Sequence, residues 1–101
     1  MGIDVKLKAE NGELLGQVAD GQSVLSAATR STLSETVLLK YLMPWGDAVF
    51  NQSQATDLEH DIQAVISAHP GTPLARLVSN LLPLVERLHS EAHLYLWFVG
   101  D

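Results

Sequence analysis

The feature that most constrains this chain is an apolar run close to its C-terminal end. Residues 93–99 read His-Leu-Tyr-Leu-Trp-Phe-Val, and almost all of these residue types favour β-strands. Because only two residues follow the run, we expect this strand to pair with segments that lie far upstream. The chain is therefore predicted to close into a sheet through non-local pairing, with helices between the paired strands.

A β-hairpin is predicted over residues 3–19. The Asn-Gly pair at residues 11–12 is typical of a two-residue type I′ turn, in which both central residues have a positive φ. A turn at this point places Lys6 opposite Gln17 and separates apolar from polar side chains onto two faces. Gly16 lies on the apolar face, where it indicates either a bulge or the close approach of another element.

Two main helices are predicted in the second half of the chain. The first covers about residues 57–69; it starts at a Thr-Asp-Leu-Glu sequence typical of a capping box and ends before the Pro-Gly pair at 70–71. The second covers about residues 73–91, begins with proline and carries a wide apolar face. Pro83 lies opposite that face, so we expect this helix either to bend or to break near Asn80.

Shorter elements are predicted between the hairpin and the main helices. They are a short helix at 23–29 with Ser23 as its N-cap, a second at 35–42, and an extended segment at 45–51. The second helix is expected to carry Val37, Leu38, Tyr41 and Leu42 on one apolar face, although Thr36, Val37 and the leucines also suit a strand. The whole chain, residues 1–101, is interpreted as one α+β domain. Its N-terminal β-hairpin and C-terminal strand form one antiparallel or mixed sheet, packed on the two main helices and the short helices.

Composition argues against several classes of function. The sequence has no cysteine, which excludes disulfides, thiolate metal sites and a cysteine nucleophile. The formal net charge of −6 argues against binding to nucleic acids or anionic membranes, which depends on basic side chains. We find neither a signal peptide nor an apolar run approaching the roughly 20 residues that span a bilayer, so a cytoplasmic protein is expected. Known catalytic motifs are absent, and we predict that the protein is not an enzyme.

The acidic residues are unevenly distributed. No Lys or Arg occurs between Lys40 and Arg76. The acidic residues of this stretch are Asp47, Asp57, Glu59 and Asp61. An uncompensated acidic segment attracts a basic partner and speeds its arrival, so we predict these four residues as partner-binding. The alternative is a solvated face that keeps a small protein soluble.

The strand at 93–99 has two apolar faces. One face carries leucines and Phe98, and the other carries Tyr95 and Trp97. Helices normally cover only one face of such a sheet, so Tyr95 and Trp97 need another cover. Either the segment 45–50 or the short helices fold across them, or they form a partly exposed aromatic patch that a protein partner binds.

Two acid–x–x–His pairs suggest a different kind of function. Asp57 with His60, and Glu86 with His89, have the spacing of metal-ligand pairs in di-metal helical bundles. A small metal-binding protein or enzyme built on these pairs is therefore an alternative. Such bundles need four helices, however, and neither pair is centred on the apolar face of its helix. No metal or other cofactor is predicted.

Two motifs resemble a family of small bacterial proteins without an established activity. They are residues 45–51, Trp-Gly-Asp-Ala-Val-Phe-Asn, and the ending 98–101, Phe-Val-Gly-Asp. The family has a Tyr-Gly-Asp-Thr-type turn followed by Val-Phe-Asn, so Trp45 and Ala48 depart from its pattern. The resemblance covers most of the chain and implies no mechanism. In size and acidity the chain is also similar to immunity proteins of toxin–immunity pairs, including those of contact-dependent growth inhibition.

The leading hypothesis is a non-enzymatic protein-binding module, an immunity protein that neutralises a cognate bacterial toxin through an acidic face. Trp45 is expected to anchor the contact, with Tyr95 and Trp97 as further partner-binding residues. A third hypothesis is a structural subunit that forms homo-oligomers through the final strand or its aromatic face.

Overall fold

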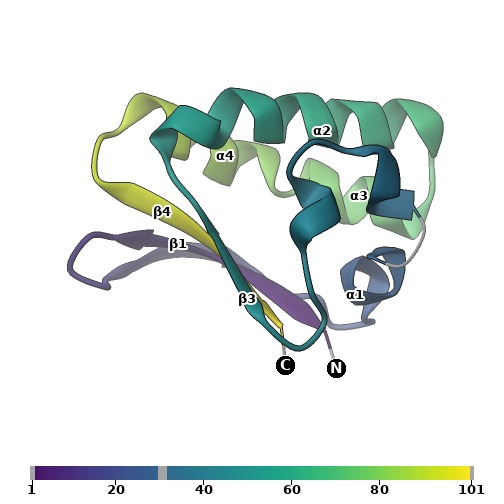
Figure 1. The fold of residues 1–101 in the computed structure, drawn as a ribbon, viewed down its shortest axis with the longest axis horizontal. Coiled ribbons are helices and arrows are strands. Elements are labelled where there is room, and N and C mark those ends of the chain that lie inside the picture. The colour runs from purple at the N-terminus through teal and green to yellow at the C-terminus, as the bar shows by residue number, and fades with distance from the viewer. Residues whose placement is uncertain (1, 30–31, 101) are drawn as a thin grey trace.

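The computed structural model describes residues 2–29 and 32–100. A four-stranded antiparallel sheet carries helices on one face, which confirms the predicted α+β class (Figure 1). The strands are β1 (Ile3–Ala9), β2 (Leu14–Val18), β3 (Asp47–Phe50) and β4 (Leu94–Gly100). The helices are α1 (Val24–Ala28), α2 (Ala55–Ala68), α3 (Pro73–Ser79) and α4 (Leu82–Ser90).

The final strand, β4, lies in the centre of the sheet. The strand order is β2-β1-β4-β3, so β4 has β1 on one side and β3 on the other. It pairs with β1 along its whole length, from Gly100 opposite Ile3 to Leu94 opposite Ala9. The prediction that this strand finds its partners far upstream is confirmed, and this pairing closes the sheet.

The loop between β1 and β2 differs from the predicted turn. The Gly12 N–H donates to the Ala9 carbonyl and the Ala9 N–H donates to the Glu13 carbonyl, while Gly12 has a φ of 90°. These bonds define a three-residue loop that ends in a left-handed glycine, so the predicted type I′ turn is wrong. A bulge beside the loop absorbs the extra residue, and Lys6 still lies opposite Gln17 as predicted.

Gly16 of β2 leaves room for a helix. It lies opposite Leu7, and a β-carbon added to it would come within 2.8 Å of Leu84 Cδ2 on α4. The expected close approach of another element at this glycine is therefore confirmed.

The core lies between the sheet and the helices. The inward face of β4 supplies Leu94, Leu96 and Phe98, all of them buried. The Phe98 ring meets Phe50 of β3 edge to face, with ring centroids 5.6 Å apart. The helices fill the other side of the core with buried residues that include Leu58, Ile62, Val65, Val78, Val85 and Leu88.

The first main helix, α2, has a different N-terminal cap from the one predicted. A 3₁₀ turn at Gln52–Gln54 precedes it, and the capping box belongs to that turn. The Asn51 side chain accepts from the Ser53 N–H, and Gln54 Oε1 accepts from the Asn51 N–H. The predicted capping box at 56–59 is wrong because those residues are already inside the helix.

The region of the second main helix contains two consecutive helices. α3 ends at Ser79 and α4 begins at Leu82, so the chain breaks near Asn80, which was one of the two expected outcomes. Pro83 stands in the first turn of α4, where a missing N–H costs no helical hydrogen bond.

Candidate docking surface

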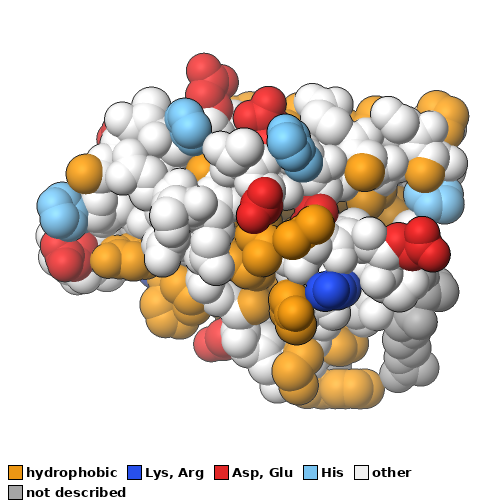
Figure 2. All heavy atoms as spheres, turned by 45° about the horizontal axis from the view of Figure 1, so that its top comes forward, with side chains coloured by type: hydrophobic (Ala, Val, Ile, Leu, Met, Phe, Trp, Pro, Cys, Tyr) orange, Lys and Arg blue, Asp and Glu red, His pale blue; other side chains and the backbone are white. Residues whose placement is uncertain are grey.

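Exposed large hydrophobic side chains are concentrated in one short segment. Val37, Tyr41, Met43 and Trp45 are 55% to 68% exposed, and together they are called the apolar loop surface below. Figure 2 shows hydrophobic side chains gathered over the lower part of one face, with acidic side chains around them. Among the described residues, only two other large hydrophobics are exposed, and both less so: Leu14 on β2 at 50% and Val49 on β3 at 41%.

The same segment also contributes to the core. Leu39 and Leu42 are buried, so they fix the segment to the body of the protein. Two 3₁₀ turns, at Thr32–Glu35 and Leu39–Tyr41, replace the short helix predicted at 35–42. Because nearly every residue from 37 to 45 is apolar and only some point inward, the remaining side chains are left in solvent.

A buried carboxylate holds this segment in place. Asp61 of α2 is only 3% exposed. Its carboxylate oxygens accept hydrogen bonds from the backbone N–H groups of Val37, Leu38 and Leu39 at 2.8, 2.7 and 3.1 Å. Asp61 was predicted to be one of the partner-binding residues. Its carboxylate is instead enclosed within the protein, so Asp61 positions the surface and does not belong to it.

The other predicted acidic residues are exposed, and they lie at different places. Asp57 is one turn before Asp61 on the same side of α2. Asp47 begins β3, two residues after Trp45. Glu59 lines a separate hollow between α2 and α4, together with Glu86 and other residues. Of the four predicted acidic residues, Asp47 is thus close in sequence to Trp45 and Asp57 is close along α2 to Asp61, whereas Glu59 lies apart.

Tyr95 and Trp97 lie on the open face of the sheet. β3 runs beside β4 in the same sheet, and α2, α3 and α4 lie on the opposite face (Figure 1). The segment 45–50 therefore does not fold across them. Both side chains are half-buried, and the Lys8 ammonium lies 4.7 Å from the centroid of the Trp97 ring. A lysine of the same open face thus supplies part of the cover.

The two motifs that carry the family resemblance meet in space. The Gly100 N–H donates to the Gly46 carbonyl at 2.9 Å. A β-carbon added to Gly100 would lie 2.4 Å from Met43 O and 2.6 Å from Gly46 O. The chain around Gly46 and the end of β4 are therefore in backbone contact, and this contact positions the end of the apolar loop surface.

This contact makes the replacement Gly100→Ala costly. The new methyl group meets backbone atoms that cannot rotate away, so we expect the free energy of unfolding to fall by about 1–3 kcal/mol. Gly21→Ala is the matched control, because a β-carbon there meets nothing within 4 Å and should change the stability by less than about 0.5 kcal/mol. Urea denaturation of both variants measures the difference, and equal stabilities would contradict the contact.

A second buried carboxylate, Asp20, was not among the predicted functional residues. It is 4% exposed and accepts from the backbone N–H groups of Ile3, Leu25 and Ser26 at 3.0 to 3.2 Å. It thereby ties the start of β1 to the start of α1. Ser23 occupies the N-cap position of α1, as predicted, but its side chain makes no capping hydrogen bond and its φ is 56°.

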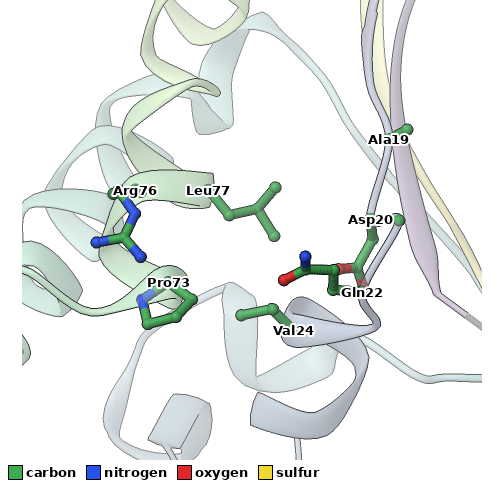
Figure 3. A pocket seen from close by; sticks show the side chains of 8 residues that line it. Ala19, Asp20, Gln22, Val24, Pro73, Arg76 and Leu77 are labelled. Atoms are coloured by element: carbon green, nitrogen blue, oxygen red, sulfur yellow. The ribbon is translucent and has the colours of Figure 1, made fainter.

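A hollow of about 400 Å³ adjoins Asp20, between the chain at 19–24 and α3. Figure 3 shows Pro73, Arg76 and Leu77 facing Gln22 and Val24 across it. The Arg76 guanidinium donates to the Gly71 carbonyl at 2.8 Å, while the Asp20 carboxylate is occupied by backbone donors. The hollow lies where α1 packs against α3 and is not part of the apolar loop surface.

The acid–x–x–His pairs lie on the exposed sides of their helices. Asp57, His60, Glu86 and His89 are all exposed. Glu86 and His89 line the same hollow as Glu59. Within residues 2–29 and 32–100, however, no group of three or more His, Asp or Glu side chains is arranged to hold a metal ion. The metal-binding alternative therefore gains no support from the geometry.

An exposed ion pair stabilises the end of α4. Arg87 Nε lies 2.8 Å from Glu91 Oε2, and this hydrogen bond raises the pKa of Arg87 and lowers the pKa of Glu91. A lowered pKa means that the contribution of Glu91 to stability is present above its unfolded-state pKa and is lost as the pH falls. Solvent screening keeps this contribution small.

Comparison with protein-family models, curated proteins and solved structures finds no match. In the described part of the chain, every helix is too short or too polar to cross a bilayer.

Proposed function

We propose that this protein is a non-enzymatic protein-binding module, and specifically an immunity protein that neutralises a basic bacterial toxin domain in the cytoplasm. The observation that carries the proposal is the apolar loop surface. Large exposed apolar patches on small proteins are characteristic of protein interaction sites. Tyr41 and Trp45 belong to the residue types that dominate binding energy at interfaces.

The attachment of the surface supports this proposal. Ordering a flexible loop on binding costs about 0.5–1.5 kcal/mol per immobilised side chain. Here the backbone at 37–39 is already held by three hydrogen bonds to Asp61, and Leu39 and Leu42 are packed in the core. Part of the ordering cost is therefore met during folding, which favours tight binding of one partner.

The charge around the surface indicates the chemistry of that partner. Asp47, two residues after Trp45, and Asp57, one turn before Asp61 on α2, are both exposed, and the whole chain carries a formal net charge of −6. The Lys40 ammonium lies 5.3 Å from the centroid of the Tyr41 ring, so a positive charge is present within the surface too. A partner that is basic overall and presents an apolar centre fits this arrangement.

The neighbouring genes provide the test of function. We expect a gene beside this one to encode a basic toxin domain whose expression stops growth, and we expect co-expression of this chain to restore growth. The double variant Tyr41→Ala/Trp45→Ala should fail to restore it, while Leu14→Ala, an equally apolar change outside the surface, should restore it. Growth arrest that this chain does not relieve would contradict the proposal.

The association rate should depend strongly on salt. Between about 0.01 M and 1 M ionic strength the screening length falls from about 30 Å to about 3 Å. We therefore expect the association rate constant with the toxin domain to fall by about ten-fold or more, with a smaller change in the dissociation rate. Stopped-flow fluorescence measures both rates. The double variant Asp47→Asn/Asp57→Asn should show a weaker salt dependence, and an association rate that does not change with salt would rule out the electrostatic contribution.

A further inference from the structure

β3 is an edge strand whose outer side is open to a further strand. It pairs with β4 alone, and within the described residues no other strand lies against it. The opposite edge, β2, is interrupted by a bulge, which twists an edge away from further pairing. β3 carries no bulge, so it is the more regular of the two edges.

The hydrogen-bond register shows which backbone groups face outward. The Gly100 N–H donates to Gly46, and Ala48 lies opposite Phe98, so the even-numbered residues of β3 direct their backbone groups toward β4. In an antiparallel pair the direction alternates along the strand, so the N–H and C=O groups of Asp47 and Val49 point away from the sheet. No hydrogen bond within the described residues uses them.

The side chains beside these groups define a pattern. Asp47 and Val49 are exposed, and both project onto the open face of the sheet, where Val49 lies opposite Trp97. A strand added antiparallel to β3 places one residue opposite Val49 and, two residues later, another opposite Asp47. An apolar residue suits the first position, and Lys or Arg suits the second.

We infer that β3 binds an extended segment of a protein partner with the sequence pattern apolar–x–basic, by antiparallel strand addition at Asp47 and Val49. This inference rests on the proposed function, because it describes how the basic partner would continue the contact beyond Trp45. Main-chain hydrogen bonds supply the attraction, while Val49 and Asp47 select the side chains.

Synthetic peptides test the inference without the natural partner. The probe is the acetylated and amidated peptide Thr-Thr-Val-Thr-Lys-Thr-Thr, titrated at millimolar concentration into the full chain labelled with ¹⁵N. We expect hydrogen exchange of the Asp47 and Val49 amides to slow and their resonances to shift. A peptide with Glu in place of Lys should bind about three-fold more weakly or worse.

Two matched changes separate strand addition from side-chain contact. N-methylation of the peptide valine removes the N–H that meets the Val49 carbonyl and should abolish binding, whereas N-methylation of the following threonine, which points away, should not. In the protein, Val49→Pro removes only an outward N–H, which an edge strand tolerates, while Val49→Ala retains it. The proline variant should not bind the peptide, and the alanine variant should bind it.

Several results would overturn the inference. The first is that no peptide binds, and the second is that resonance shifts are confined to β2 at 14–18. The third is that both N-methylated peptides bind equally well. The fourth is that the Asp47 and Val49 amides become protected from exchange as the protein concentration rises without peptide, which would indicate pairing of two copies. The proposed function is tested separately. If Tyr41→Ala weakens binding of the toxin domain and Val49→Pro does not, the proposed function stands and the inference of strand addition is overturned.

Discussion

Replacement of Asp61 by alanine is expected to lower the free energy of unfolding by about 3 kcal/mol. The change removes the acceptor for the N–H groups of Val37, Leu38 and Leu39, of which the Leu39 N–H is buried. Each unsatisfied buried donor costs about 1–3 kcal/mol, and water reaches the two outer groups in part. Urea denaturation measures the loss, and amide hydrogen exchange at 37–39 should speed up by more than global unfolding explains.

Two controls accompany this change. Asp57→Ala removes an exposed carboxylate one turn away on the same helix and should cost less than about 1 kcal/mol. Asp61→Asn retains the size of the side chain and one acceptor oxygen, so its cost should lie between the other two. If Asp61→Ala is no less stable than Asp57→Ala, the carboxylate does not hold the apolar loop surface in place.

Replacement of Asp20 by alanine is expected to have an effect of similar size, about 3 kcal/mol. It leaves the N–H groups of Ile3 and Leu25 without their buried acceptor and releases the start of α1 from β1. Thermal or urea unfolding measures the stability, and amide exchange at Ile3 reports the local effect. Asp47→Ala, at an exposed aspartate, should change the stability by less than about 0.5 kcal/mol. Equal losses in the two variants would contradict the role of Asp20.

The sheet could be predicted because its signals are local and periodic. Alternation of apolar and polar residues identified β1 and the face that it buries, since side chains alternate strictly along a strand, and an unbroken run of residue types that favour strands identified β4. The details of the β1–β2 loop could not be predicted in the same way. Asn11 and Gly12 suit both two-residue and three-residue loops, and only the position of the bulge decides between them.

The roles of the buried carboxylates depend on contacts between distant residues. Asp61 binds the backbone more than 20 positions upstream, which no local pattern encodes. One signal was present, however: Asp61 lies three residues after Leu58 and four before Val65, within the apolar stripe of α2. A carboxylate in that position must be paired when it is buried.

The exposed apolar residues were also only partly predictable. Trp45 was singled out from the sequence, but Val37, Tyr41 and Met43 were not, because the segment was interpreted as a helix with Tyr41 on its apolar face. The 3₁₀ turns change which side chains point inward. Tertiary packing of Leu39 and Leu42, and not helix propensity, therefore determines what this segment exposes.

Binding through the apolar loop surface is tested most directly by isothermal titration calorimetry. The measurement compares the affinity of the toxin domain encoded beside this gene for two single variants. Tyr41→Ala removes an anchor of the apolar loop surface and should weaken binding by about ten-fold or more, whereas Leu14→Ala, at the far edge of the sheet, should leave it unchanged. Wild-type affinity in Tyr41→Ala, or a loss in Leu14→Ala of equal size, would contradict the proposal that this protein binds its partner through the apolar loop surface.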